Sequence, residues 1–413
     1  MDHVRDRESS EMKIGIVSTL FDFAWTGGEE LWAAMAYAAL GQDHEVLISV
    51  TGWPKTPDPI LALQRRGARV FFRYPLRRTW KYKDRLIRIL EKYKIAPIFQ
   101  NSAYRVFSSF RSFFESGPDV VLINQGGLYD ALIYKELLFL LERTRVPYVI
   151  ISHFAADTGP SLAADRAKAI QFLSRASRLA VVAKASLETM ERQLACPIPG
   201  ILVLRNPVNL PDLSSIAWPE QKPLRFANLA RLEVGTKGQD LLLKSLYSKQ
   251  WLNREWRLSL CGKGPDEEYL RELARYYGLA DRIDFLGHIE DIRALWSQHH
   301  LLVLPSRSES APLALVEAML CGRPSVVTDV GGVREWVQEP QTGFVAEAPA
   351  PGYYTSALER AWQARDTWRQ MGTQAHEAAI TRYDPRPGKT LLEVVIAASK
   401  TRSAVKTPNI LFD

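Results

Sequence analysis

The sequence has few of the residues from which disulfide frameworks and metal sites are built. Its 413 residues include three cysteines, Cys196, Cys261 and Cys321, at no paired spacing, and its seven histidines form no metal-ligand pattern. Scattered thiols are typical of a reducing compartment. We therefore expect a cytoplasmic protein with no disulfide framework and no bound metal.

Long apolar runs are also missing. Residues 1–11 are polar and mixed in charge, without the apolar core of a signal peptide. No later stretch approaches the roughly 20 apolar residues that a membrane-spanning helix needs. We expect a protein that is soluble, or attached only peripherally to the inner membrane face.

Acidic residues are scarce in one segment. Residues 64–94 contain twelve Lys or Arg and only two acids, with six aromatic residues among them. A solvated surface explains such a run, and a surface for anionic lipid headgroups or a phosphorylated acceptor is the alternative of equal weight. Nucleic acid is a weaker third interpretation, because no nucleic-acid module accompanies the segment. We therefore expect no nucleic-acid partner.

Apolar residues are abundant and regularly arranged. Hydrophobic residues make up 46% of the chain and charged residues 24%, which suits packed cores rather than a disordered chain. Short β-branched runs alternate with helical patterns, as in doubly wound α/β folds. Strands are expected in the first half at residues 13–18, 45–50, 68–73, 119–124, 148–152, 178–182 and 201–204. Helices are expected between them at residues 28–40, 80–93, 130–143 and 184–194.

A proline-punctuated stretch, residues 206–223, then reads as an interdomain linker. The alternation restarts with expected strands at 225–229, 257–261, 282–286, 301–305, 325–328 and 343–346. Expected helices cover 238–248, 267–277, 292–299, 312–321, 333–337, 353–364, 368–382 and 391–399. We predict an α/β fold with two doubly wound, Rossmann-like domains, residues 12–208 and 209–385, facing each other across a cleft. Residues 386–413 should pack back on the first domain, because their apolar helix face would otherwise be exposed.

Candidate site residues follow expected strands, where open α/β sheets bind ligands. Gly27 and Gly28 open a helix, where close backbone approach and unpaired N–H groups suit an anion, although a capping turn would look the same. Arg231 and Lys237 flank a glycine-containing loop and suit a leaving group that gains negative charge, or are simply solvated. His153 ends a strand, and alone it is a weak signal.

Glu309 and Glu317 lie on either side of an expected helix start. Glu309 precedes Pro312, a good first-turn residue, and Glu317 lies about a turn and a half inside an otherwise apolar helix. Capping explains Glu309 equally well, but a carboxylate on the apolar helix needs exposure or a partner. A bound anion would face the backbone amides of Ala311, Leu313 and Ala314.

Taken together, these residues resemble the retaining, GT-B fold glycosyltransferases of family four, the glycosyl transferases group 1. The most specific part is residues 303–324, continued by Gly-Gly-x-x-Glu at 331–335 and Thr-Gly-Phe-Val at 342–345. Glu309 and Glu317 stand eight positions apart, as in the family's E-x7-E motif. Gly262 matches its turn after the second C-terminal strand. The resemblance covers nearly the whole chain, strongly from 226 to 345 and loosely from 52 to 116.

The resemblance implies a metal-independent transfer of a hexose, with retention of configuration, from a UDP- or GDP-linked sugar. Four residues would be catalytic: Arg231, Lys237, Glu309 and His153. The two cations would stabilise the departing diphosphate, Glu309 would hold sugar hydroxyls, and His153 would face the donor sugar. Glu317 would hold the nucleotide ribose.

The remaining donor-binding residues would be Gly27, Gly28, Gly262, Ala311, Leu313 and Ala314. No cofactor beyond the nucleotide sugar is implied. The hydroxyl acceptor stays open between a polysaccharide, a lipid-linked sugar and a small molecule, because acceptor recognition falls in the half where the resemblance is loose.

Two other functions remain alternatives. A nucleotide-sugar epimerase of the same fold would use the same domains, but it needs acid and base groups around the sugar ring. A non-catalytic protein that binds sugar nucleotides would need only part of the set. A nicotinamide dehydrogenase is least expected, because no full Gly-x-Gly-x-x-Gly follows either first strand.

Overall fold

The computed structural model describes residues 11–20, 24–73, 109–155 and 166–400. The chain divides into two compact units. The N-terminal unit comprises Met1–Val182, Leu187–Pro207 and Arg386–Asp413, and the C-terminal unit comprises Ala183–Ser186 and Val208–Pro385. The expected helix at 80–93, most of the basic segment 64–94 and the tail 401–413 lie outside the described residues.

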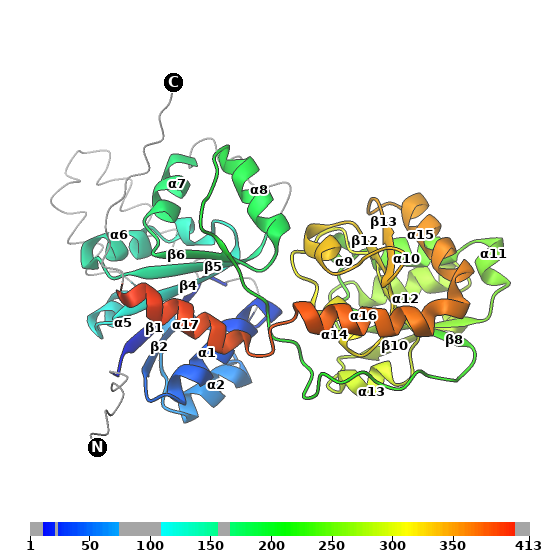
Figure 1. Cartoon of the computed structure of the whole chain (residues 1–413), viewed down its shortest axis with the longest axis horizontal. Helices are drawn as coiled ribbons and strands as arrows, with labels where there is room; N and C mark the ends of the chain where they lie inside the picture. Colours follow the sequence, from blue (N-terminus) through cyan, green and yellow to red (C-terminus); the bar gives the residue numbers. More distant parts are fainter. Residues whose placement is uncertain (1–10, 21–23, 74–108, 156–165, 401–413) are drawn as a thin grey trace, which may run out of the picture. The chain divides into compact units, whose positions relative to one another are not determined.

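The N-terminal unit contains a parallel sheet of seven strands in the order β3-β2-β1-β4-β5-β6-β7 (Figure 1). The strands are β1 (Lys13–Ser18), β2 (Glu45–Thr51), β3 (Arg69–Arg73), β4 (Val120–Gly127), β5 (Tyr148–Phe154), β6 (Arg178–Val181) and β7 (Leu202–Val203). The helices are α1 (Gly27–Leu40), α2 (Asp58–Arg65), α5 (Arg111–Glu115), η1 (Asp130–Ile133), α6 (Lys135–Thr144), α7 (Arg166–Ser174), α8 (Lys184–Leu194) and α17 (Pro387–Lys400).

The central strands of this sheet are apolar on both faces. In β1 every residue after Lys13 is buried, and the first six residues of β4 are buried too. Helices cover both faces of such a sheet, which explains the continuous apolar runs. The winding direction reverses between β1 and β4, and ligands of open α/β sheets bind where the strand order reverses.

Helix α17 returns to the N-terminal unit and lies against α1 (Figure 1). Its side chains Leu391, Leu392, Val395 and Ala398 are buried. The two helix backbones approach closely, because a Cβ atom added to Gly388 would lie 2.5 Å from the carbonyl carbon of Ala34. A Cβ atom at residue 388 would therefore force the helices apart.

The C-terminal unit contains a second parallel sheet, in the order β10-β9-β8-β11-β12-β13. Its strands are β8 (Leu224–Leu229), β9 (Trp256–Cys261), β10 (Ile283–Gly287), β11 (Leu301–Leu304), β12 (Ser325–Thr328) and β13 (Gly343–Ala346). Its helices are α9 (Val234–Lys237), α10 (Gln239–Leu246), α11 (Lys249–Leu252), α12 (Glu267–Tyr276), η3 (Ala280–Arg282), α13 (Ile292–Trp296), α14 (Leu313–Leu320), η4 (Gly331–Glu335), α15 (Pro351–Gln363), η5 (Arg365–Thr367) and α16 (Trp368–Arg382).

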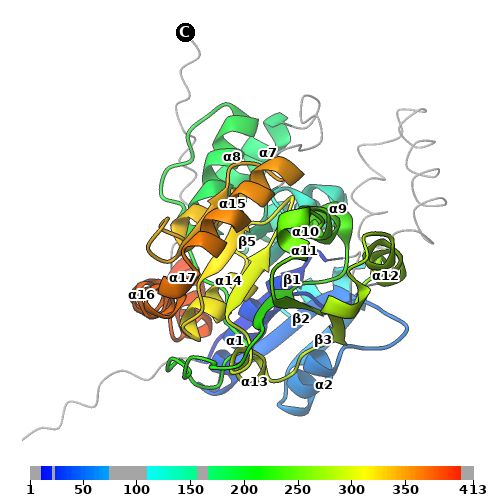
Figure 2. The same ribbon diagram turned by 90° about the vertical axis from the view of Figure 1, so that its right-hand side faces the viewer.

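Two apolar cores lie on the two faces of this second sheet. One core joins α10, α12 and α15 around Phe226, Trp251 and Trp256, and the other joins α13, α14 and α16. Figure 2, in which this unit faces the viewer, shows α10 and α15 on the same side of the strands. The predicted α/β fold of two doubly wound, Rossmann-like domains is thus confirmed.

Some local predictions were wrong. The single helix expected at 130–143 is instead a 3₁₀ turn, η1, followed by α6. The helix is interrupted at Tyr134, whose φ of −96° and ψ of 77° are not helical. Tyr134 donates its hydroxyl hydrogen to the carbonyl oxygen of Thr19, a long-range bond that the local pattern does not show. The helix expected at 333–337 is the 3₁₀ turn η4.

None of the helices in the described ranges is long and apolar enough to cross a membrane.

Candidate functional site

The two loops at the strand-order reversal of the C-terminal unit meet directly. Lys237 ends the short helix α9 after β8, and Glu309 lies in the loop after β11, the neighbouring strand. Lys237 Nζ lies 2.7 Å from Glu309 Oε1, and Ser306 Oγ donates to the same oxygen at 2.8 Å. The two charged side chains are 25% and 10% exposed, so this ion pair is largely shielded from water.

Close backbone contact holds these loops together. Gly238 follows Lys237 with φ of 65°, and a Cβ atom there would lie 2.1 Å from the carbonyl oxygen of Pro305 at the end of β11. Gly331 has φ of 55°, and a Cβ atom there would lie 1.9 Å from the carbonyl oxygen of Glu309. Only glycine fits either position without displacing the loop that carries the ion pair.

Gly262 has a similar role at the neighbouring strand. Its φ is 145°, and a Cβ atom would lie 2.0 Å from the carbonyl oxygen of Ala230. The turn after β9 therefore packs on the loop that carries Arg231. The Arg231 guanidinium lies 3.9 Å from Glu233 and is 39% exposed, so it remains accessible to a ligand.

The helix α14 begins at Leu313, after Pro312 at its N-cap. The N–H groups of Leu313 and Ala314 lie in the first turn, where no helical carbonyl can accept from them. Ala311 precedes the proline. Ala311, Leu313 and Ala314, which were predicted to bind the sugar donor, are all half-buried. This helix start follows Glu309 by four positions, so N–H groups without an intrahelical partner and the Lys237–Glu309 pair lie in one short region.

Glu317 lies deeper on α14 and is only 6% exposed. Its Oε1 accepts a hydrogen bond from the backbone N–H of Asn209 at 2.9 Å. Burial raises the pKa of Glu317 to about 7, and the bond from Asn209 opposes that rise. The partner that a carboxylate on this apolar helix requires is thus a backbone group of the linker.

A second set of candidate residues lies in the N-terminal unit, where Gly27 and Gly28 begin α1. A Cβ atom added to Gly28 would lie 3.0 Å from His153 Cγ, so the helix start rests on the histidine ring. His153 is the penultimate residue of β5 and is 9% exposed. Burial lowers its pKa to about 4, and Asn206 opposes that fall.

Buried polar side chains that the sequence analysis did not select connect to this histidine. His153 Nε2 lies 2.7 Å from Asn124 Oδ1, and Asn124 Nδ2 donates to Glu29 Oε1 at 2.9 Å. Ser18 Oγ donates to the same Glu29 oxygen at 3.1 Å. Glu29 is 3% exposed, and burial raises its pKa to about 7. Glu29 is the one residue of this network that the sequence could have indicated, because it is an acid in the first turn of the helix.

Arg73 does not belong to a solvated basic surface. It is 2% exposed, and it donates to the carbonyl oxygen of Ser49 at 2.8 Å and to that of Ser18. Its guanidinium also lies over the rings of Phe110 and Tyr134, 4.9 Å and 5.4 Å from their centroids. This arginine therefore stabilises the carboxyl edge of β1, β2 and β3 from inside.

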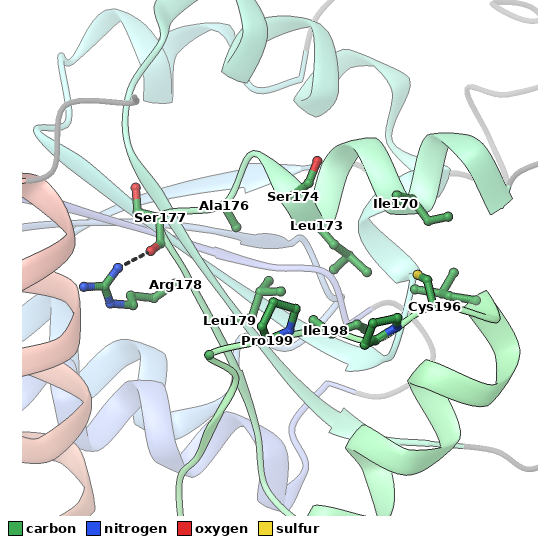
Figure 3. A pocket seen from close by; sticks show the side chains of 13 residues that line it. Ile170, Leu173, Ser174, Ala176, Ser177, Arg178, Leu179, Cys196, Ile198 and Pro199 are labelled. Carbon is green, nitrogen blue, oxygen red and sulfur yellow. Dashed lines mark hydrogen bonds between the residues drawn. The ribbon is translucent and has the colours of Figure 1, made fainter. Parts of the chain in front are cut away.

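An apolar groove of about 750 Å³ lies elsewhere in the N-terminal unit, between α7 and the loop after α8 (Figure 3). Its lining residues include Ile170, Leu173, Leu179, Ile198 and Pro199. The groove reaches Arg178, the first residue of β6, so it lies at the edge where strands begin. Candidate site residues lie at the opposite edge, and the groove is not part of either set.

Comparisons with known proteins point to one family. Residues 215–378 match the family described as glycosyl transferases group 1. An uncharacterized glycosyltransferase of Haemophilus influenzae is 32% identical over 136 residues, 31% of this chain and 38% of that protein. The N-acetyl-alpha-D-glucosaminyl L-malate synthase of Bacillus anthracis is 33% identical over 130 residues, 31% of this chain and 33% of that protein. The chain thus spans only about a third of the length of each of these relatives.

Solved structures share the architecture over nearly the whole chain. HepE of Anabaena, in complex with UDP and glucose, has a TM-score of 0.70 at 18% identity and covers 94% of this chain and 100% of its own. A glycosyltransferase of Rickettsia africae has a TM-score of 0.69 at 14% identity and covers 95% and 100%. Such identities establish the fold and not the activity. Residues 215–378 are thus similar to the glycosyl transferases group 1 family, and the two units have the GT-B fold of the solved glycosyltransferases.

Proposed function

We propose that this protein is a retaining glycosyltransferase of family four, which moves a hexose from a nucleotide diphosphate sugar to a hydroxyl acceptor. The observation that carries the proposal is the Lys237–Glu309 ion pair at the strand-order reversal of the C-terminal unit, beside the start of α14. A shielded cation, a carboxylate and unpaired N–H groups suit a ligand that combines a diphosphate with sugar hydroxyls. The pair lies within the region that matches the family.

In the proposed reaction, Lys237 and Arg231 stabilise the negative charge that develops on the diphosphate as the bond to the sugar breaks. An incoming diphosphate competes with Glu309 for Lys237, which leaves the Glu309 carboxylate to accept hydrogen bonds from sugar hydroxyls. Amides of Ala311, Leu313 and Ala314 add donors for the phosphates. Glu317 accepts a hydrogen bond from the nucleotide ribose.

The acceptor hydroxyl attacks the anomeric carbon on the face from which the diphosphate departs. The carbon–oxygen bond to the diphosphate breaks, the bond to the acceptor oxygen forms, and the hydroxyl proton passes to an oxygen of the leaving group. No protein base is then required. Arg231 and Lys237 take the place of the divalent ion that other transferases use, so we expect the reaction to be independent of metal.

The N-terminal unit is the proposed acceptor side. Gly27 and Gly28 also allow the start of α1 to approach the donor, the nucleotide sugar, and His153 packs against Gly28. The acceptor is a polysaccharide, a lipid-linked sugar or a small molecule. If it is lipid-linked, the basic segment 64–94 would bind the anionic inner face of the membrane, at roughly 1 kcal/mol for each basic residue near the surface.

The first experiment is a screen of UDP-, GDP- and ADP-sugars for donor hydrolysis and for thermal stabilisation. UDP-sugars come first, because HepE binds UDP. A donor present at a hundred times its dissociation constant should stabilise the protein by about 2.7 kcal/mol. If no nucleotide sugar raises the melting temperature and none is hydrolysed, the proposal is wrong. Sugar isomerisation without an acceptor would favour an epimerase.

A further inference from the structure

A chain of four hydrogen bonds with fixed polarity leads to His153. It begins at the backbone N–H of Leu20, which donates to Ser18 Oγ at 3.2 Å. Because a backbone N–H can only donate, the hydroxyl hydrogen of Ser18 is left to point away, and it points to Glu29 Oε1. The chain continues through Asn124 to the histidine ring.

Glu29 determines which way the amide of Asn124 faces. A carboxylate can only accept, so the NH₂ group of Asn124 must face Glu29, and the amide oxygen must face His153. The Ser18 hydroxyl donates to the same Oε1, which favours Oε2 as the site of a proton on Glu29. An amide oxygen accepts, so His153 Nε2 must carry a hydrogen.

The opposite side of the ring lies near Asn206. His153 Nδ1 and Asn206 Oδ1 are both buried without a hydrogen-bond partner in the part of the chain that the structure describes. An Nδ1 atom without hydrogen could not bond to an amide oxygen, so the missing bond agrees with a hydrogen on Nε2. A doubly protonated ring would donate to Asn206, but burial disfavours that charged form.

We infer that Glu29 and Asn124 are positioning residues that hold His153 as the neutral imidazole with its hydrogen on Nε2, directly beneath Gly28. Nδ1 is then a hydrogen-bond acceptor. The consequence for catalysis rests on the proposed function: His153 packs against Gly28 as a neutral ring and contributes no positive charge for the diphosphate. Glu29 acts on the ligand only through Asn124 and the ring.

Nitrogen NMR of the full chain labelled with ¹⁵N-histidine tests the tautomer directly. The His153 resonances are identified by their loss in His153→Gln. At pH 7 the wild type should show a protonated Nε2 and an unprotonated Nδ1. A protonated Nδ1, with or without a hydrogen on Nε2, would overturn the inference.

The variant Glu29→Gln tests the positioning role. Glutamine can donate as well as accept, so Asn124 can turn over, and the single tautomer should become a mixture. The matched control is Glu30→Gln, which changes the next residue on the same helical turn, an exposed carboxylate that accepts from Trp25 Nε1. Glu30→Gln should leave the His153 resonances unchanged. An unchanged single tautomer in a folded Glu29→Gln variant would contradict the role of Glu29.

Turnover gives a second readout once a donor is known. Glu29→Gln should lower kcat by about ten- to a hundredfold, the loss expected from a slightly misplaced group, whereas Glu30→Gln should retain it. If the proposed function is wrong, the wild type will transfer no sugar. The NMR result would still show which tautomer His153 adopts.

Discussion

At the residue scale, the contact between Lys237 and Glu309 joins two side chains that are 72 positions apart in the sequence. Both were candidates on their chemistry alone, a cation and a carboxylate after separate strands. Their meeting depends on β8 and β11 being neighbours in the sheet. Glu29, Asn124 and Arg73 were not selected, because an isolated buried polar residue looks like a surface residue in sequence.

Lys237→Ala should lower turnover by about 10²–10³, the loss typical of one group that stabilises developing charge. Steady-state kinetics at saturating donor measures it. The matched control is Lys244→Ala in the same unit, where the ammonium lies over the rings of Tyr247 and Tyr277. Its turnover should stay close to that of the wild type. Near wild-type turnover in Lys237→Ala would rule out the leaving-group role.

The free energy of unfolding should depend on pH through Glu317. Its pKa is raised from 4.5 to about 7 in the folded state, so between these values the folded protein holds a proton that the unfolded chain has lost. Stability contributed by this group is therefore present at low pH and decreases as the pH rises through 7, by roughly 3 kcal/mol in total.

The variant Glu317→Gln should lose this dependence. Its free energy of unfolding, relative to the wild type, should increase between pH 5 and pH 8 in urea titrations. The control is Glu272→Gln, which replaces an exposed carboxylate on α12 and should follow the wild type across the same range. A constant difference between Glu317→Gln and the wild type would show that Glu317 is ionised in the folded protein.

At the element scale, helix packing places α17 in the N-terminal unit. The amphipathic pattern of residues 391–399 predicts a helix with one buried face, and Leu391, Leu392 and Val395 are buried as that pattern requires. The local sequence does not predict which helix covers that face. Contact with α1 depends on two small residues, Gly388 and Ala34, that let the backbones approach.

Two helices that begin with Pro-Gly provide a matched test of this packing. In α17 a methyl group on Gly388 would collide with the backbone of Ala34, whereas in α15 the space beside Gly352 is open within 4 Å. Gly388→Ala should therefore destabilise the protein by about 1–3 kcal/mol. Gly352→Ala should stabilise it slightly, by up to about 1 kcal/mol, because alanine favours helix. Thermal unfolding of both variants decides, and equal effects would refute the close contact.

At the scale of the whole molecule, two units of the same architecture each hold one set of candidate residues. The C-terminal unit presents Lys237, Glu309 and the start of α14, and the N-terminal unit presents His153 beneath Gly28. In both units these residues follow strands at or next to the reversal of strand order. The same topological rule therefore explains both sets.

The proposed sugar transfer should not require a divalent ion. Arg231 and Lys237 supply the positive charge at the proposed leaving group, so transfer measured in excess chelator should equal transfer in untreated buffer. The control is manganese added back to the chelated protein, which should change nothing. Activity that disappears with chelator and returns with manganese would contradict the proposed mechanism.

Hydrophobic periodicity and glycine positions predicted the alternation of strands and helices and the loops that carry candidate residues, because both are local signals. The family motif added the pair Glu309 and Glu317. Which loops meet became clear only from the fold, since strand order depends on long-range packing and not on any one segment. It also decided that Glu29 and Arg73 are buried. Burial removes water from a charged group, and no local pattern records how much water the fold leaves there.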